Sequence, residues 1–281
     1  MKYAASITLY NPEPAFIDNL LVFATYFPLV IVNDNSKDNN AYVHRLSNIP
    51  SIHYLWDGSN WGLPAAFNRS LQICEERGID YLCTLDQDSK LSSKAISLIE
   101  HYIENSDMSS IGIVSSAPSG IELRSEEMEI GAVMEEKKHI CSGSFINLKL
   151  LKEHGIIYDE AYFVDAFDTD LCYQIRTAGL KIHVLTGVLM PHVWGEEMGY
   201  TPLRHYYIFR NRLYFNTKFF NLPESLFRSV LLTVLDCWNL RNEREPFKKI
   251  RMLPLAISDY RKGRMGEVNP QTLEKINKIV Q

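Results

Sequence analysis

Short apolar runs, which are typical of buried strands, alternate along most of the chain with segments whose apolar residues recur every three to four positions, which is typical of helices. Apolar runs at 3–10 and 29–33 predict buried strands, and apolar positions three to four residues apart at 14–26 predict a helix between them. Further strands are predicted at 52–55, 81–86, 111–115, 139–147 and 181–185, with helices at 65–77 and 94–105. This alternation predicts an α/β fold, with a Rossmann-like, mostly parallel sheet flanked by helices.

The C-terminal part of the chain has a different pattern. Helices are predicted at 222–238 and 248–260, where Lys and Arg stand beside Leu, Phe, Trp and Met. We therefore predict an α/β domain over 1–215 and a helical, basic and amphipathic appendage over 216–281. The acidic, aperiodic stretch 122–136 is predicted to be a surface loop without chemistry.

Charge and cysteine content narrow the class of protein. The formal net charge of -5 excludes a uniformly basic nucleic-acid-binding protein, although residues 201–265 hold 13 Lys and Arg against 5 Asp and Glu. That basic segment suits a membrane surface or a helical appendage packed on the main domain. The five cysteines are odd in number and widely spaced, which favours a reducing cytosol over disulfide or zinc chemistry. No signal-peptide pattern precedes the first strand, and the longest later apolar run, 229–235, is far short of the roughly 20 residues that span a bilayer.

Two carboxylates end the predicted strand 81–86, in the sequence Asp86-Gln87-Asp88. Neighbouring acids repel one another unless a cation lies between them, and carboxylate oxygens favour hard cations such as Mg²⁺ or Mn²⁺. Mg²⁺ usually keeps only one or two protein carboxylates and takes its other ligands from water and substrate phosphates. The motif therefore indicates a site for a substrate that carries a diphosphate. An isolated Asp-x-Asp is also compatible with a solvated turn after a strand.

Other strand ends and loops carry polar and small residues that suit a ligand site. Asn11 follows the first strand and Asp34 the second, and in open parallel sheets ligands bind outside the carboxyl ends of strands. Asp34 is equally suited to an Asx turn. Asn60 and Gly62 fit a loop of unusual backbone angles, and Gly143, between two serines, lets a ligand lie against the backbone.

A second acidic cluster, Asp165, Asp168 and Asp170, opens a predicted helix. Acids in a first turn complement the helix dipole, so a capping role is open for each of them. The functional alternative is that one carboxylate faces the crevice and takes a proton from a substrate hydroxyl. His192 lies just past the last predicted strand, where it is either structural or a third metal ligand. The segment 204–212, rich in Arg and Tyr, suits either contact with a diphosphate or packing as an amphipathic helix.

Over residues 3–215 the chain resembles the family 2 inverting glycosyltransferases of the GT-A fold, and most closely the rhamnosyltransferase-like branch that builds bacterial cell-surface polysaccharides. The resemblance rests on eight segments in order: Thr8 to Pro12, Val32 to Ser36, Asn60 to Gly62 with Ala66 and Asn68, Leu85 to Asp88, Ser142 to Ser144, Phe163 to Asp168, His192 to Gly195, and Tyr206 to Asn211. One such match is weak, whereas eight in the same order are specific.

The resemblance implies a nucleotide-sugar donor, a divalent ion and a single displacement that inverts the anomeric carbon, with Asp168 as the catalytic base. Residues matched to the donor site are Thr8, Tyr10, Asn11, Asn33, Asp34, Asn60, Gly62, Asn68, Asp86, Gln87 and Arg210. Residues matched to the metal, Mg²⁺ or Mn²⁺, are Asp86, Asp88 and His192, and the acceptor-side or secondary candidates are Gly143, Asp165 and Asp170. The chain departs from the family at two positions, because the family usually has Asp where this chain has Asn33 and Glu where it has Phe167. The departure at Asn33 affects the contact with the nucleotide base, so the donor nucleoside can be uridine or thymidine.

We therefore expect a metal-dependent glycosyltransferase, with dTDP-rhamnose as a candidate donor and a lipid-linked or other oligosaccharide as acceptor. The basic segment 201–265 predicts peripheral contact with the inner face of the cell membrane, in a cytoplasmic protein that binds no nucleic acid. A sugar nucleotidyltransferase is the alternative enzyme class, although residues 8–14 lack its usual glycine-rich loop with a basic residue. A nucleotide-sugar-binding protein without activity is the other alternative, and it requires Asp168 to be dispensable.

Overall fold

The computed structural model describes residues 1–38, 42–119, 128–191 and 201–281. The chain forms two compact units, of which the first contains 1–158 and 168–192 and the second 159–167 and 193–281. The predicted boundary after residue 215 falls inside helix α7 (Pro202–Phe219). The reason is that aromatic residues of α7 share a core cluster with the C-terminal helices.

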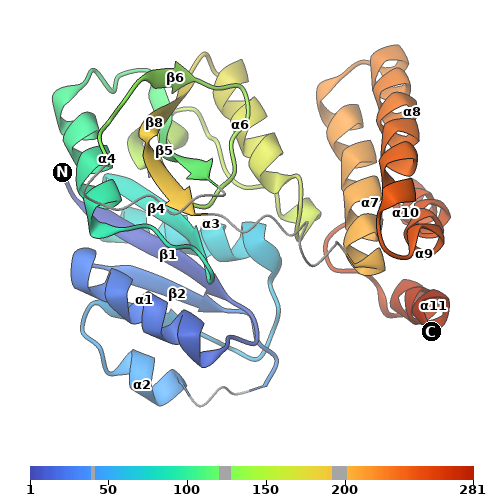
Figure 1. Ribbon diagram of the computed structural model, residues 1–281, viewed down its shortest axis with the longest axis horizontal. Helices are drawn as coiled ribbons and strands as arrows, with labels where there is room; N and C mark the ends of the chain where they lie inside the picture. Colours follow the sequence, from blue (N-terminus) through green and yellow to red (C-terminus); the bar gives the residue numbers. More distant parts are fainter. Residues whose placement is uncertain (39–41, 120–127, 192–200) are drawn as a thin grey trace. The chain divides into compact units, whose positions relative to one another are not determined.

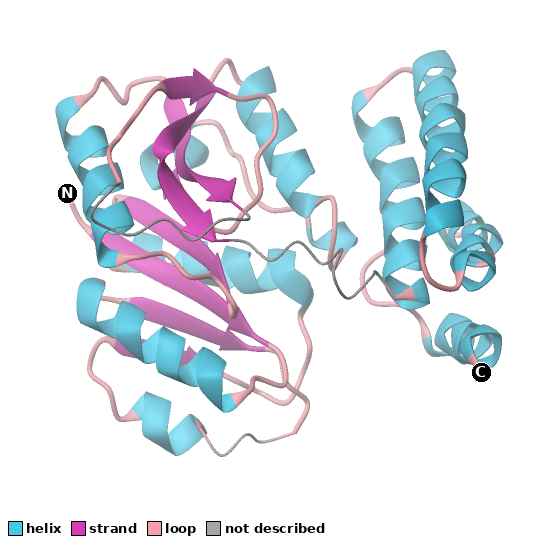
Figure 2. Ribbon diagram, viewed as in Figure 1, coloured by secondary structure: helices cyan, strands magenta, loops and turns pink. Residues whose placement is uncertain are grey.

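An eight-stranded sheet forms the centre of the described part of the first unit (Figures 1 and 2). Its strands lie in the order β3-β2-β1-β4-β7-β5-β8-β6, and β7 and β6 run antiparallel to the others. The strands are β1 (Tyr3–Leu9), β2 (Val30–Asp34), β3 (Ile52–Leu55), β4 (Tyr81–Asp86), β5 (Ile111–Ser119), β6 (Val133–Glu135), β7 (Ser144–Asn147) and β8 (Lys181–Pro191). The predicted α/β class with a mostly parallel sheet is confirmed.

Four strands differ from what the sequence predicts. Strand β6 lies within the stretch predicted as a loop, because residues 133–135 pair antiparallel with 183–185 of β8. Strand β7 is shorter than the predicted strand 139–147, since a turn at Gly143, with a φ of 76°, precedes it. Strands β5 and β8 continue together past their predicted ends to Ser119 and Pro191.

Helices cover both faces of the sheet. Those of the first unit are α1 (Pro14–Tyr26), α2 (Val43–Ser47), α3 (Gly62–Glu76), α4 (Ser93–Asn105), α5 (Leu148–Glu153) and α6 (Phe167–Thr177). On one face, Ile7 of β1 belongs to the same buried cluster as Phe23 of α1 and Ile99 of α4. Leu82 of β4 and Cys74 of α3 belong to the other cluster. Because both faces of the central strands are covered, the strand ends are the places left for a ligand.

The second unit is helical, as predicted for the C-terminal part of the chain. Besides α7 it contains α8 (Leu222–Asn239), α9 (Pro246–Ile250), α10 (Met252–Arg261) and α11 (Pro270–Val280). Its buried core includes Tyr206 and Phe209 of α7 with Met252 and Ala256 of α10. Among the described residues, no helix combines the length and the hydropathy needed to cross a bilayer.

Candidate active site

The ends of β1, β2 and β4 lie side by side at one edge of the sheet. In the parallel register Leu9 of β1 pairs with Asp34 of β2, and Thr8 pairs with Asp86 of β4. The predicted strand ends therefore share one edge, called here the carboxyl edge. The backbone N–H of Tyr10 donates to Oε1 of Gln87 at 2.9 Å, which joins the loops after β1 and β4.

A tight turn after β4 carries the predicted metal ligands. Ser89 closes this turn, because its N–H donates to the Asp86 carbonyl at 3.1 Å and its Oγ accepts from the Asp86 N–H at 2.8 Å. The Ser89 hydroxyl also shares a hydrogen bond with the hydroxyl of Ser142, in the loop before β7. The turn is thus fixed from within the fold, while Asp86 is half-buried and Asp88 is exposed.

The loop after β2 is built around the buried carboxylate of Asp34. Oδ1 accepts from the Ser36 N–H at 2.9 Å, which is the Asx turn that the sequence left open. Oδ2 accepts from the hydroxyl of Tyr54. Oγ of Ser36 in turn accepts from the N–H of Asn11 at 2.8 Å, so the loops after β1 and β2 are also joined.

Three buried polar atoms near this edge have no hydrogen-bond partner among the described residues. They are Oγ1 of Thr8, Oδ1 of Asn33 and Oδ1 of Asn35, whose residues are 6%, 0% and 3% exposed. Nδ2 of Asn35 donates to the carbonyl of Gly62, and Oδ1 of Asn60 accepts from the Gly62 N–H at 3.0 Å. Unpaired buried polar atoms are costly, so these three support a ligand that supplies the missing partners.

Asn33 and Asn68, both predicted to contact the donor, connect elements of the fold. Asn33 is fully buried, and its Nδ2 donates to Oγ of Ser70 at 2.9 Å and to Oγ of Ser6 at 3.3 Å. Nδ2 of Asn68 donates to the Tyr158 carbonyl at 2.8 Å, and its Oδ1 accepts from the Tyr158 N–H at 3.0 Å. The Nδ2 group of Asn33 and the amide of Asn68 thus serve packing, whereas Oδ1 of Asn33 has no partner among the described residues.

Asp168 lies in the first turn of α6. Its Oδ1 accepts from the N–H of Thr169 at 2.6 Å and from the Thr169 hydroxyl at 3.3 Å. Cys141, before β7, connects the surroundings of Asp168 with β4, because it lines a small cavity together with Asp168 and its carbonyl accepts from the Thr84 hydroxyl at 2.5 Å. Burial raises the pKa of the Cys141 thiol well above its usual value, and the nearby charges of Asp86 and Asp168 raise it further. The loop before β7 is therefore next to Asp168 and is also joined to the turn after β4, through Ser142 and Ser89.

Gly143 owes its identity to packing. Its φ of 76° is unfavourable for other residues, and an added Cβ would lie 2.6 Å from Oγ of Ser116 and 2.8 Å from Sδ of Met190. The Gly143 N–H donates to the carbonyl of Thr84 at 2.8 Å. These contacts explain the glycine without a ligand.

The other two acids of the second cluster are held by neighbouring side chains. Asp170 is fully buried and accepts from Nε2 of Gln174 at 2.5 Å. Asp165 belongs to the second unit, where Arg204 donates to its carboxylate through Nε and Nη2 at 2.9 to 3.2 Å. Burial raises the pKa of Asp165, and Arg204 opposes that rise.

A turn with unfavourable backbone angles precedes Asp168 in the chain. Phe163, Asp165 and Ala166 have φ values of 62°, 57° and 67°, in the left-handed region that residues other than glycine rarely adopt. Asn211 of α7 holds this turn within the second unit. Its Nδ2 lies 3.0, 2.6 and 3.0 Å from the carbonyl oxygens of Tyr162, Val164 and Asp165. The sequence pattern placed Asn211 in a matched segment but gave no role for it.

We expect Asn211→Ala to destabilise the protein by about 3 kcal/mol, because it leaves buried carbonyl oxygens without their donor. The melting temperature measures this effect. The matched control, Asn242→Ala, removes an exposed amide of the same unit and should change stability by less than about 0.5 kcal/mol. Equal melting temperatures for the two variants would show that the turn is held by other contacts.

Arg210 and His192 gain no support as ligand contacts. Arg210 is fully buried in the second unit, where its guanidinium donates to the carbonyl of Gly266 at 2.7 Å and that of Arg264 at 3.3 Å. Its N–H groups also contact Oδ1 of Asn211 at 3.3 Å. The structure thus gives Arg210 a packing role. His192 lies outside the described residues.

Asp86 and Asp88 fit a divalent ion that arrives with a diphosphate. Among the described residues, no three His, Cys, Asp or Glu side chains gather closely enough to hold a metal by themselves. One half-buried and one exposed carboxylate at a strand end match the way Mg²⁺ is held in part by protein and in part by substrate phosphates.

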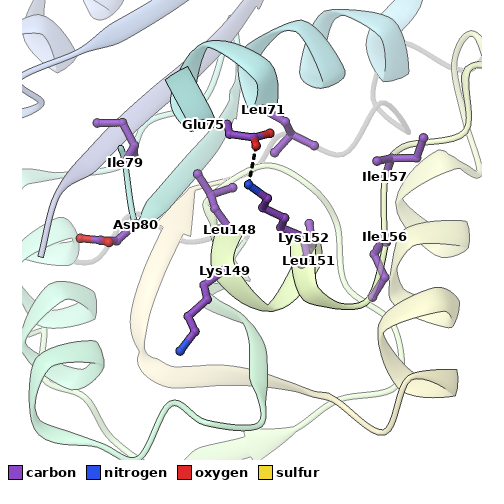
Figure 3. A pocket seen from close by; sticks show the side chains of 11 residues that line it. Leu71, Glu75, Ile79, Asp80, Leu148, Lys149, Leu151, Lys152, Ile156 and Ile157 are labelled. Carbon is purple, nitrogen blue, oxygen red and sulfur yellow. Dashed lines mark hydrogen bonds and ion pairs between the residues drawn. The ribbon is translucent and has the colours of Figure 1, made fainter. Parts of the chain in front are cut away.

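A cavity of about 460 Å³ lies elsewhere in the first unit (Figure 3). Its lining includes Asp80, Leu148 and Ile156, and Lys152 pairs with Glu75 there at 2.5 Å. Asp80 precedes β4 and Asp86 ends it, so the cavity and the carboxyl edge lie at opposite ends of this strand. The cavity is therefore no part of the candidate active site.

Known proteins share both the sequence pattern and the fold. Residues 13–154 match the model of the family described as Glycosyl transferase family 2. The chain is 23% identical over 231 residues to dTDP-rhamnosyl transferase RfbF of Shigella flexneri, which covers 74% of this chain and 77% of the relative.

Two solved structures resemble this one along nearly the whole chain. TarS of S. aureus, residues 1–349, has a TM-score of 0.58 and 16% identity, and the match covers 99% of this chain and 83% of TarS. The mannosyltransferase PcManGT of Pyrobaculum calidifontis, in complex with GDP-Man and Mn²⁺, has a TM-score of 0.57 and 13% identity, with coverage of 99% and 80%. The fold is therefore GT-A. Because the family match spans half of the sequence and includes Asp34, Asp86 and Asp88, this chain belongs to glycosyltransferase family 2.

Proposed function

We propose that the chain is a metal-dependent, inverting hexosyltransferase that moves a sugar from a nucleotide donor to a saccharide acceptor in the synthesis of bacterial cell-surface polysaccharide. The observation that carries this proposal is that the parallel strands place Asp34 and Asp86 on either side of the end of β1, where the buried Oγ1 of Thr8 has no partner among the described residues. Similarity to a dTDP-rhamnosyl transferase makes dTDP-rhamnose the first donor to test. A solved neighbour that holds Mn²⁺ supports the divalent ion.

In the proposed reaction Asp168 accepts the proton of the acceptor hydroxyl while the hydroxyl oxygen attacks the anomeric carbon. The attack comes from the face opposite the leaving nucleoside diphosphate, which inverts the anomeric configuration. Asp86 and Asp88 hold the Mg²⁺ or Mn²⁺ ion, which when bound offsets the negative charge of the leaving diphosphate. The proposed donor contacts at the carboxyl edge are Thr8, Tyr10, Asn11, Asp34, Asn35, Asn60, Gly62 and Gln87.

The acceptor in this proposal is a lipid-linked or other oligosaccharide, and the reaction takes place in the cytoplasm at the inner face of the membrane. The five cysteines are free, which suits a reducing compartment. The excess of Lys and Arg over residues 201–265 suits contact with anionic lipids.

A melting-temperature screen of UDP-, GDP- and dTDP-sugars, each with and without Mn²⁺, tests the donor and the metal together. We expect one nucleotide sugar with Mn²⁺ to raise the melting temperature by about 5 to 10 °C at 100 times its Kd, and to have little effect without metal. The transferred sugar should have the inverted anomeric configuration by NMR. Pyrophosphate release from a sugar phosphate and a nucleoside triphosphate would identify a nucleotidyltransferase, and donor binding without transfer would identify a non-catalytic protein.

A further inference from the structure

Helix α8 in the second unit has polar side chains on its inner side. Ser225 and Ser229 are its buried residues, and Nδ2 of Asn216 in α7 donates to Oγ of Ser229 at 2.9 Å. Asp236 of α8 forms an ion pair with Arg212 of α7. The contact between α7 and α8, which lie side by side (Figure 1), is therefore polar. A surface helix on a hydrophobic core has the opposite arrangement.

The opposite side of α8 is apolar and exposed. Seven residues form it, called here the outer face, and each is 44% to 66% exposed. They are Leu226, Phe227, Val230, Leu231, Val234, Leu235 and Trp238. With about 3.6 residues per turn they cover about half of the helix circumference. A contiguous exposed face of this kind marks an interaction surface, whereas a single exposed apolar side chain does not.

A cationic segment, residues 241–251, follows the outer face directly. It holds five Lys and Arg against two acids. The acids are neutralised within the segment, because Glu243 pairs with Lys249 at 2.6 Å and Glu245 pairs with Lys248 at 2.8 Å. The exposed cations and aromatic side chain that remain are Arg241, Arg244, Phe247 and Arg251. The guanidinium of Arg241 lies 3.4 Å from the ring centroid of Trp238, so the cationic segment begins at the end of the outer face.

We propose that the outer face of α8 lies in the plane of an anionic membrane surface, with the cationic segment on the lipid phosphates. This proposal rests on the proposed function. It narrows the membrane-binding region from residues 201–265 to α8 and the cationic segment after it. Helix α7 belongs to the same basic stretch, but Tyr206 and Phe209 direct it into the core of the second unit. An apolar helix face bordered by aromatic and cationic side chains is typical of helices at the boundary between headgroups and acyl chains.

Charge favours lipid over a second copy of the chain as the occupant of this face. A symmetric pair joined through two outer faces would also bring the cationic segments against the partner helix. Helix α8 has two acids, and both have partners: Asp236 pairs inward with Arg212, and Glu224 pairs with Arg228 at 2.8 Å. The partner helix thus has no further acid for these cations, whereas anionic lipid phosphates supply the countercharge.

Flotation of the full chain with lipid vesicles, without donor or acceptor, tests the proposal. We expect binding to vesicles of phosphatidylcholine with phosphatidylglycerol and weak binding to phosphatidylcholine alone. The triple variant Arg241→Gln, Arg244→Gln, Arg251→Gln should lose about 100-fold in affinity for the anionic vesicles. The matched control, Lys2→Gln, Lys94→Gln, Lys149→Gln, removes as much exposed charge and should stay within about twofold, because these lysines belong neither to the outer face nor to the cationic segment.

The apolar part is tested by Phe227→Gln, Leu231→Gln, Leu235→Gln, whose exposed positions leave the fold intact and whose vesicle affinity should fall at least about tenfold. Absence of binding to anionic vesicles, or equal binding by wild type and both triple variants, would overturn the proposal. A dimer that this apolar variant abolishes, without vesicle binding, would identify a second copy as the occupant. Transfer to a soluble acceptor should persist in all variants, so loss of membrane binding is distinguishable from failure of the proposed transferase activity.

Discussion

Asp168→Asn should lower the turnover of sugar transfer by about 10²- to 10⁴-fold, because an amide cannot take the proton of the acceptor hydroxyl. The substituted side chain keeps an oxygen for the hydrogen bond from the Thr169 N–H, which is 2.6 Å long in the wild type. The first turn of α6 should therefore be preserved, and the rise in melting temperature caused by the donor should be unchanged. Single-turnover transfer of a labelled sugar measures the effect.

Asp165→Asn and Asp170→Asn are the matched controls for this experiment. Asp170 is buried against Gln174 and Asp165 is paired with Arg204, so Asp170→Asn weakens a buried hydrogen bond and Asp165→Asn removes the charge of an ion pair. We expect each to lower the melting temperature while turnover per folded molecule stays within about tenfold of wild type. If Asp168→Asn kept its turnover and either Asp165→Asn or Asp170→Asn lost it, the aspartate replaced in the inactive variant would be the catalytic base.

The carboxyl edge could be predicted from the sequence because strand direction follows from the alternation of strands and helices. Once β1, β2 and β4 are parallel, the residues after each of them must lie at one edge. The observed register, with Leu9 beside Asp34 and Thr8 beside Asp86, fulfils that expectation. The Asp34 turn was also foreseen as one of two alternatives, since an Asp followed by Asn and Ser favours an Asx turn.

The side-chain directions within buried elements could not be predicted in the same way. Asn33 lies in a strand that is covered on both faces, so polar and apolar residues do not alternate along it. The sequence therefore does not show toward which face of the sheet the Asn33 amide points. Its partners, Ser6 and Ser70, come from distant parts of the sequence. Arg210 is a similar case, because the carbonyl oxygens that it binds lie more than fifty residues further along the chain, at Arg264 and Gly266.

The direction of the side chains of α8 could not be predicted from the sequence either. Its mixture of apolar and basic residues predicted an amphipathic helix, but a membrane surface and packing on the protein remained equally compatible with that composition. The choice depends on the partners of its polar residues. Ser229 and Asp236 bind Asn216 and Arg212 of α7, and only these tertiary contacts show that the apolar side faces outward.

Asp88→Asn should remove most of the metal dependence of donor binding and lower sugar transfer by about 10²- to 10³-fold. A neutral amide is a weaker ligand than a carboxylate for a hard cation, and the cation contributes several kcal/mol by offsetting charge on the leaving diphosphate. Asp88 is exposed, so the substitution should change the stability of the unliganded protein by no more than about 0.5 kcal/mol. Titration of Mn²⁺ against the rise in melting temperature caused by the donor separates metal binding from turnover.

Asp18→Asn provides the control for Asp88→Asn, because it removes a carboxylate of similar exposure whose contact is a surface ion pair with Arg45. It should leave the Mn²⁺ titration and the turnover unchanged, since exposed ion pairs contribute little. Asp86→Asn should lower transfer as Asp88→Asn does, and it should also reduce stability slightly, because Asp86 is half-buried in the turn closed by Ser89. Full activity of the wild type after removal of divalent ions with EDTA would contradict the role of both carboxylates, because the carboxyl edge would then hold the diphosphate without a metal.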